Sequence, residues 1–205
     1  MFKHLRQAFF ATLVLTLLLG VAYPLAVTYL SGAIFPHQAH GSLITRADGT
    51  VIGSELIGQN FTGPGYFHGR PSATTDADPA DSTKTVPAPY NAASSNASNA
   101  APTSKALIAD IQARVEALKA ENPDARAEVP VDLVTTSASG LDPHISVAGA
   151  LYQAPRVAKA RGLSEEDVAG KVQEATEGRT FGLLGEPRVN VLKLNLALDN
   201  QAARK

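Results

Sequence analysis

The chain has 205 residues, of which 44% are hydrophobic, and a formal net charge of −1. This length suffices for one membrane anchor and one domain with its own core, but not for two full domains. The near-neutral charge argues against a nucleic-acid partner, because binding to phosphates needs a basic face. The sequence contains no cysteine, which excludes disulfides and thiolate zinc sites.

An uncharged apolar run, FFATLVLTLLLGVAYPLAVTYL, occupies residues 9–30. At about 1.5 Å per residue, a helix of this length crosses a hydrocarbon core of roughly 30 Å. A cleaved signal peptide is the alternative, but its apolar core extends over only about 7–15 residues. Here apolar character continues past possible cleavage sites at Ala22 and Ala26 to Phe35. The sequence therefore favours an uncleaved transmembrane helix in a lipid bilayer, with Pro24 favouring a kink.

Basic residues flank this run on its N-terminal side. Lys3 and Arg6 precede it, and the next lysine or arginine is Arg46. The positive-inside rule therefore predicts a cytoplasmic N-terminus at residues 1–8 and an extracytoplasmic domain at residues 36–205. The expected location is the cell inner (plasma) membrane, with a single pass and a periplasmic or otherwise extracytoplasmic domain.

The first part of the outer domain is expected to hold a hairpin, a loop and a helix. Asp48-Gly49 suits a two-residue turn with positive φ. Residues 73–103 are mainly Ala, Ser, Thr, Asn, Asp and Pro, which indicates a mobile low-complexity loop. The helix begins after Thr103 or Ser104 and ends at Asn122-Pro123. Its expected apolar face consists of Leu107, Ile108, Ile111, Val115 and Leu118.

The second part is expected to mix strands and helices. Alternating apolar residues over 129–135 predict a strand. A helix is expected after Ser146, bent or broken by Pro155, and another after Ser164, which opens a capping-box-like pattern. The alternating leucines of 192–198 predict a half-buried closing strand. The predicted fold class is α/β or α+β, with one N-terminal transmembrane helix followed by a single mixed extracytoplasmic domain.

The segment TSASGLDPHIS places Ser137, Ser139, Asp142 and His144 close together, residue types that hydrolases use. A nucleophile elbow needs glycine two residues before the serine, where Ser139 has Ser137. Triad members also converge from separate elements rather than from one turn. The pattern favours a strand-to-helix turn held by side-chain hydrogen bonds, with Ser146 as the N-cap. A membrane-anchored hydrolase using Ser139 or His144 remains an alternative, as does a solute-sensing module.

The sequence offers no clear metal or nucleotide site. His37-x-x-His40 has no third ligand at suitable spacing nearby. No P-loop pattern is present, so the chain is not expected to hydrolyse ATP alone.

The segment YFHGRPSA places Tyr66, Phe67, His68 and Arg70 between glycines and Pro71. Arginine combined with aromatic residues on a rigid loop is a composition typical of protein interfaces. A self-packed loop in which Arg70 binds carbonyl groups is the alternative. Composition favours neither.

The longest distinctive stretches are VAYPLAVTYL, IGSELIGQNFTGPGYFHGRPSA, VPVDLVTTSASGLDPHIS, QAPRVAKARGLS and GEPRVNVLKLNLALD. Together they resemble one family, the C subunit of the Kdp-type potassium-transporting P-type ATPase. The resemblance covers residues 6–199 apart from 74–104. There the family's shorter Ser-Gly-Gly-Ser-Asn stretch is replaced by SSNASN, in which Asn96 takes the place of the family's asparagine.

The resemblance implies a non-catalytic accessory subunit of a high-affinity, ATP-driven potassium uptake pump. Its partners are then a channel-like potassium-binding subunit and a P-type ATPase subunit. These handle potassium and ATP, and this chain alone binds no cofactor. The implied role is to assemble or stabilise the complex and, as a catalytic chaperone, to raise the ATP affinity of the ATPase subunit. An extracytoplasmic domain can do this only through its partners. The expected subunit interface comprises Tyr66, Phe67, His68, Arg70, Ser137, Ser139, Asp142 and His144.

Overall fold

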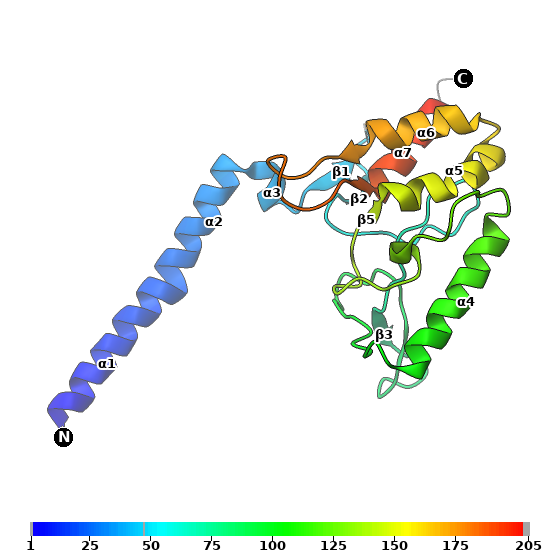
Figure 1. Cartoon of the computed structure of the whole chain (residues 1–205). Coiled ribbons are helices and arrows are strands. Elements are labelled where there is room, and N and C mark those ends of the chain that lie inside the picture. Colours follow the sequence, from blue (N-terminus) through cyan, green and yellow to red (C-terminus); the bar gives the residue numbers. More distant parts are fainter. Residues whose placement is uncertain (1, 47, 203–205) are drawn as a thin grey trace. The chain divides into compact units, whose positions relative to one another are not determined.

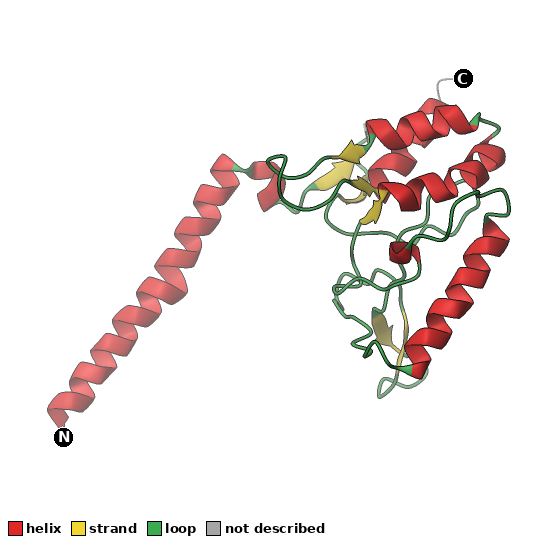
Figure 2. Cartoon of the chain, in the orientation of Figure 1, coloured by secondary structure: helices red, strands yellow, loops and turns green. Residues whose placement is uncertain are grey.

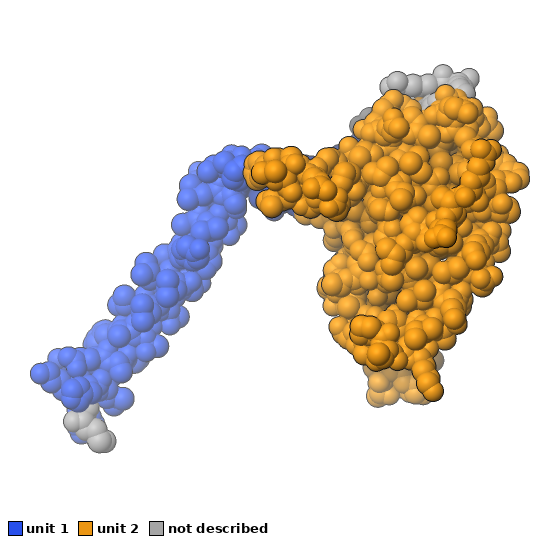
Figure 3. Space-filling view, in the orientation of Figure 1, with its two compact units in different colours: residues 1–54 blue, residues 55–205 orange. Residues whose placement is uncertain are grey.

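The computed structural model describes residues 2–46 and 48–202. Residue 1 of the expected cytoplasmic segment and residues 203–205 of the expected domain lie outside this part. The chain divides into two units, residues 1–54 and 55–205 (Figure 3). The outer domain was expected to begin at residue 36, whereas this division groups residues 36–54 with the N-terminal helix.

The first unit begins with one long apolar helix. Its 33 residues, Phe2–Ile34, extend over about 50 Å at the usual helical rise. The apolar run of residues 9–30 lies wholly inside it, and the helix is long and apolar enough to cross a membrane. In order, it consists of α1 (Phe2–Leu17), the π-helical turn η1 (Leu18–Ala22) and α2 (Tyr23–Ile34) (Figure 1).

The π-helical turn ends at Ala22, two residues before Pro24. In this wide turn the Tyr23 amide donates to the Leu18 carbonyl, five residues back. Proline has no amide hydrogen, and its ring clashes with the carbonyl four residues earlier in a regular helix. Widening the turn accommodates both effects without interrupting the helix.

A short helix and a hairpin complete the first unit. The hairpin forms around Asp48-Gly49 as predicted, and Gly49 adopts a φ of +84°. The Asp48 side chain accepts a hydrogen bond from the Thr50 amide at 2.9 Å. The loop extends from residue 46 to residue 50, so it is longer than the expected two-residue turn. The elements are α3 (Pro36–Ala39) and the antiparallel strands β1 (Leu43–Thr45) and β2 (Val51–Ser54).

The second unit is a mixed α/β domain, as predicted. Its central sheet is antiparallel with the order β5-β7-β6, and α5, α6 and α7 lie beside one another next to it (Figure 2). The strands of this sheet are β5 (His144–Ser146), β6 (Thr176–Glu177) and β7 (Arg188–Asn190). The helices are α4 (Lys105–Glu121), the 3-10 turn η2 (Val131–Leu133), α5 (Val147–Arg161), α6 (Glu165–Glu174) and α7 (Val191–Ala202).

The core of this unit lies where α5, α6, α7 and the central sheet meet. Burial of the aliphatic and aromatic side chains in this core is the main source of the domain's stability. The buried members include Phe67, Leu133, Ile145, Tyr152, Val157, Val168, Val172, Val189, Leu194 and Leu198.

Three helix starts predicted from the sequence are confirmed. The hydroxyl of Ser104 accepts the Leu107 amide hydrogen at 3.4 Å. The hydroxyls of Ser146 and Ser164 do the same for the amides three residues further on, at 2.9 Å and 3.0 Å. These contacts satisfy donors that a helix start leaves free. Helix α5 continues through Pro155 without a break.

Two strand predictions are wrong. Residues 129–135 contain the turn η2 instead of a strand. The Asp132 carboxylate turns towards the start of α5, where it accepts the amide and hydroxyl hydrogens of Ser146 at 2.7 and 2.9 Å. In the closing segment β7 ends at Asn190 and α7 begins at Val191. The Asn190 side chain accepts the Lys193 amide hydrogen at 3.1 Å and so caps this helix.

Residues 73–103 contain a short hairpin that was not expected from the sequence. Strands β3 (Thr75–Ala77) and β4 (Thr85–Pro87) pair antiparallel. Thr74, at the base of this hairpin, is buried, and its hydroxyl donates to the Ala88 carbonyl at 2.5 Å. The base of the expected mobile loop is therefore tied into the domain.

Candidate functional site

The segment around Phe67 and His68 passes between α5 and α7, and two side-chain amides hold its backbone. Asn195 of α7 accepts the Phe67 amide hydrogen at 2.8 Å and donates to the Phe67 carbonyl at 3.0 Å. Gln153 of α5 binds the His68 backbone in the same way, at 2.8 and 3.1 Å. Phe67 is 0% exposed. Its ring therefore belongs to the core and not to the surface expected for a subunit interface.

His68 directs its ring towards the end of α4. Nε2 lies 3.1 Å from the Gly63 carbonyl, and Nδ1 lies 3.5 Å from the Glu121 carboxylate. Burial, reinforced by the positive charge of Arg156, lowers the pKa of His68. The surroundings of His68 thus disfavour its protonated form, and structural contacts position its ring.

Tyr66 lies at the edge of the same segment and remains partly exposed. Its ring stacks on Phe61 with centroids 5.5 Å apart, and the Arg161 guanidinium lies 4.9 Å from its centroid. Arg161 also pairs with Asp199 at 2.8 Å. An arginine held between an aromatic face and a carboxylate is a rigid arrangement. The YFHG stretch is therefore largely self-packed, which was the alternative to an interface loop.

The turn of residues 137–142 uses its serines for structure. The Ser137 hydroxyl accepts the Gly140 amide hydrogen at 2.9 Å, and the Ser139 hydroxyl accepts the Leu141 amide hydrogen at 3.1 Å. Gly140 adopts a φ of +69°, and a Cβ there would lie 2.5 Å from the Asn96 carbonyl oxygen. Only glycine fits this position.

The two candidate segments meet at Arg70 and Asp142. Arg70 Nη1 lies 3.1 Å from Asp142 Oδ2, and both side chains are partly exposed, at 24% and 29%. Arg70 also donates to the carbonyls of Thr135 and Thr136, at 3.4 and 3.2 Å. Burial alone would raise the pKa of Asp142, but hydrogen bonds from His144 and Arg70 outweigh it and lower that pKa.

Further charged groups extend this pair into a network. His144 Nδ1 lies 3.4 Å from Asp142 Oδ1, and its Nε2 lies 3.7 Å from the Glu177 carboxylate. Glu177 in turn pairs with Arg188 at 3.2 Å. Arg70, Asp142, His144 and Arg188 all line a depression of about 240 Å³. We call Arg70, Asp142, His144, Glu177 and Arg188 the 70/142 cluster.

Tyr90 supports this cluster from within the low-complexity loop, and it was not among the residues predicted from the sequence. Its hydroxyl donates to the Arg70 carbonyl at 2.7 Å. Its ring occupies space against Gly58 and Gly69, where any Cβ would collide with it. Burial, together with the negative charge of Asp142, raises the pKa of Tyr90 to about 12. The sequence carried one indication that Tyr90 is buried against the domain, since Tyr90 is the only aromatic residue in residues 73–103.

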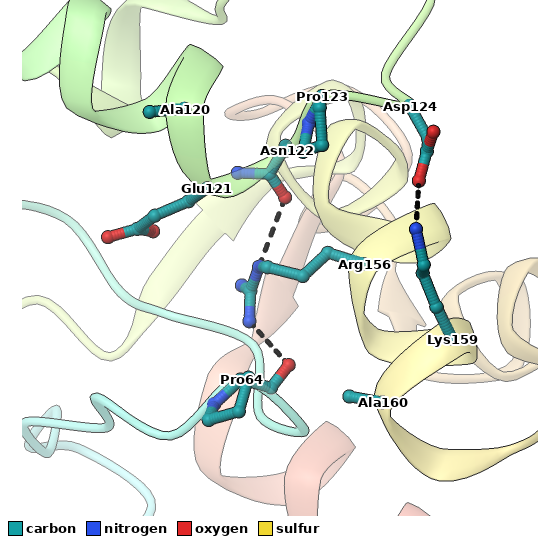
Figure 4. Close-up of a pocket in the computed structure, with 9 residues that line it drawn as sticks. All are labelled: Pro64, Ala120, Glu121, Asn122, Pro123, Asp124, Arg156, Lys159 and Ala160. Carbon is teal, nitrogen blue, oxygen red and sulfur yellow. Dashed lines mark hydrogen bonds and ion pairs between the residues drawn. The ribbon is translucent and has the colours of Figure 1, made fainter.

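A second depression, of about 280 Å³, lies between the end of α4, α5 and the turn at Pro64 (Figure 4). Arg156 crosses it, donating to the Asn122 side chain at 3.1 Å and to the Pro64 carbonyl at 2.7 Å. At its edge Lys159 pairs with Asp124 at 3.0 Å. The polar groups of this depression bind one another, so the arrangement holds α4 to α5.

The geometry does not assemble a nucleophile with a base. Among the described residues no hydrogen bond joins His144 to Ser137 or Ser139, and both serines accept backbone hydrogens instead. No three His, Cys, Asp or Glu side chains gather as a metal site within residues 2–46 and 48–202. What the 70/142 cluster offers is a rigid, partly exposed set of paired charges.

Fold and site together define a protein with one membrane-capable helix and one mixed α/β domain carrying a charged surface cluster. The chain belongs to the KdpC family, described as "K+-transporting ATPase, c chain", which matches residues 5–200. It is therefore a subunit of the potassium-transporting ATPase complex, which implies other Kdp subunits as partners.

Similar proteins cover the whole chain. A potassium-transporting ATPase KdpC subunit from Rhodopseudomonas palustris (strain BisB18) is 66% identical, over 97% of this chain and 98% of its own length. KdpC subunits from Methylobacterium nodulans and Bradyrhizobium diazoefficiens are 60% and 61% identical, over 100% of both chains in each case. The family resemblance inferred from the sequence motifs is thereby confirmed.

Proposed function

We propose that this chain is a non-catalytic accessory subunit of an ATP-driven potassium uptake pump of the inner (plasma) membrane. Its N-terminus lies in the cytoplasm and its mixed domain lies outside. Lys3 and Arg6 at the start of the apolar helix support this orientation. The chain itself binds neither ATP nor potassium, which are handled by its partners.

The 70/142 cluster is the proposed contact surface for these partners. The observation that carries this proposal is the Arg70–Asp142 pair, at 3.1 Å and partly exposed, which joins two loops distant in sequence. Charged groups already fixed in position lose little side-chain entropy when a partner binds them. Tyr66 and His68 adjoin the cluster in sequence, and Phe67 supports them from the core. Ser137 and Ser139 hold the shape of the turn that presents Asp142.

The channel-like subunit and the P-type ATPase subunit are the proposed partners. A domain outside the membrane cannot contact cytoplasmic ATP, so an effect on ATP affinity must pass through those subunits as a shift between conformations. We propose that the chain stabilises the assembled complex and, in this indirect way, raises the ATP affinity of the ATPase subunit.

Purification of the complex from potassium-limited cells tests the proposal. The full chain is tagged and extracted in mild detergent, copurifying subunits are quantified, and potassium-stimulated ATPase activity is measured as a function of ATP concentration. Asp142→Ala is expected to reduce recovery of the complex about tenfold or more, as for a central interface residue. Lys119→Ala, which removes an exposed charge on α4, is the matched control and should leave recovery unchanged.

Asp142→Asn separates an interface role from a structural one. Asparagine keeps the shape of the side chain and one acceptor oxygen, but it removes the charge and turns its NH2 group towards either the His144 amide or Arg70, which bind different oxygens of Asp142. This variant loses the Arg70 pairing and should melt at a lower temperature. If partner binding needs the charge of Asp142, recovery of the complex falls even well below that melting temperature. Full recovery of the complex with Asp142→Asn would instead mean that Asp142 acts only within the fold. Unchanged function after Ser139→Ala and His144→Ala together would rule out the hydrolase alternative.

A further inference from the structure

The loop between β6 and β7 ends in an apolar tip, residues 181–185 with the sequence FGLLG. Its three large side chains, Phe181, Leu183 and Leu184, are 90%, 80% and 63% exposed. In Figure 1 this loop extends away from α5, α6 and α7. Three adjacent large apolar side chains, each more than half exposed, indicate a surface that binds something apolar.

The backbone of the tip makes four hydrogen bonds within its own loop. The amides of Thr180 and Leu184 donate to each other's carbonyls, at 2.9 and 3.0 Å. The amides of Gly182 and Leu183 donate to Arg179 and Thr180, at 3.0 and 3.2 Å. Pairing these four amides within the loop lowers the cost of moving the tip from bulk water into the interfacial layer of a bilayer.

Charge at the base of the tip is also paired. Arg179 Nη2 contacts both carboxylate oxygens of Glu186, at 2.9 and 2.7 Å. No charged residue lies between them in the sequence. Moving the tip into a low-dielectric region therefore carries no desolvation penalty for a charged side chain within the tip.

The tip conformation is one that a bulky residue rarely adopts. Phe181 has a φ of +55°, and Gly182 and Gly185 have values of +73° and +80°. Space around both glycines is open, since a Cβ at either would meet nothing within 4 Å. A strained phenylalanine that gains no burial from its own domain points to a contact made outside it.

We propose that the 181–185 tip inserts its side chains into the interfacial layer of the lipid bilayer. The chain carries a membrane-capable helix, so the domain is confined near a bilayer and the tip meets it at high effective concentration. Three side chains by themselves cover much less than the roughly 800 Å² per partner of a stable protein interface. A partner protein would have to reach the tip from the 70/142 cluster, whose depression is also lined by Glu186 and Pro187 next to the tip. The inference depends on the membrane anchor and not on the 70/142 cluster.

The chain contains no tryptophan, so one introduced tryptophan reports its own surroundings. The full-length Leu183→Trp variant is reconstituted into phosphatidylcholine–phosphatidylglycerol vesicles, with and without brominated phospholipid as a contact quencher. Val131→Trp serves as the matched control, because Val131 is also highly exposed, at 71%, and belongs to the same unit. We expect blue-shifted, lipid-quenched emission from tryptophan at position 183, and unshifted, unquenched emission from tryptophan at position 131.

A second variant checks the cause of the quenching. Adding Phe181→Asp and Leu184→Asp to Leu183→Trp should abolish the quenching without lowering the melting temperature, because neither side chain supports the core. Unquenched emission from Leu183→Trp in vesicles would overturn the proposal. The same probe in the assembled complex distinguishes lipid from protein as the occupant. Emission that is blue-shifted but not quenched by lipid there would assign the tip to a partner subunit and would also overturn the proposal.

Discussion

Replacing Asn195 by alanine tests the reasoning about the site most directly. The Asn195 amide is buried, at 1% exposed, and serves as both donor and acceptor for the Phe67 backbone. Alanine removes both partners and leaves a buried amide hydrogen and a buried carbonyl unsatisfied.

The magnitude follows from these two orphaned groups. Each unsatisfied buried polar group costs about 1–3 kcal/mol, so the free energy of unfolding should fall by about 2–6 kcal/mol. For a chain of this size, about 1 kcal/mol changes the melting temperature by about 2–4 °C. The expected decrease is therefore roughly 5–20 °C.

Thermal unfolding of the full chain in mild detergent, followed by circular dichroism, measures this effect. Gln173→Ala is the control, because this amide lies on the exposed side of α6 and its loss should change the melting temperature by less than about 2 °C. If Asn195→Ala melted like the control, the amide would not be holding Phe67, and the account of the segment between α5 and α7 would fail.

Three further outcomes follow from the same contacts. Gly140→Ala should destabilise the domain by about 2–4 kcal/mol in urea unfolding, because φ is +69° and the new Cβ would meet the Asn96 carbonyl at 2.5 Å; a loss below about 1 kcal/mol would contradict this. Tyr90, whose pKa is raised to about 12, stays protonated in the folded state while the unfolded state ionises from about pH 10. Its stabilisation is thus complete below pH 10 and should decline by about 1 kcal/mol by pH 11, a slope absent from Tyr90→Phe. The pKa of Asp142 is lowered in the folded state. Its contribution to the free energy of unfolding is therefore fully present at pH values above the ordinary aspartate pKa, and it is lost as the pH falls through the lower, folded-state pKa. Acid titrations of Asp142→Asn should lack this component, and an unchanged acid profile would argue against the Arg70 pairing.

The helix starts were predictable because each depends on a few neighbouring residues. Ser104, Ser146 and Ser164 each precede a stretch of helical residues, and a serine hydroxyl satisfies an amide three residues ahead wherever the tertiary structure places the helix. The apolar helix was predictable for a similar reason, since length and composition alone define it.

The closing strand was mispredicted because its leucines fit two periods. Leu192, Leu194 and Leu198 alternate as in a strand, but with Val191 and Asn195 they also form one helical face, and all five are buried. In a strand Asn195 would alternate with these leucines and face away from the core. Its partner is the backbone of Phe67, distant in sequence, which no local pattern reveals.

The candidate site was predictable only in part. Arg70 and Asp142 stood out by composition within YFHGRPSA and TSASGLDPHIS, but their pairing depends on the tertiary fold. Tyr90 lay hidden in a stretch that otherwise has little to bury. The core position of Phe67 could not be separated from an exposed one, because an aromatic residue on a glycine-rich loop suits either place.

The amide of Asn195 also constrains when the domain can form. It bonds to Phe67 across 128 positions of sequence, and α7, which carries it, follows all the other helices and strands that the structure describes. Synthesis proceeds from the N-terminus, so α7 is made after the rest of the core. Until α7 emerges, the Phe67 backbone has no partner and the core lacks one of its sides. The domain therefore completes its fold only after α7 has emerged, and the nascent segment between Phe67 and α7 is the part that most needs protection from aggregation and proteolysis during that interval.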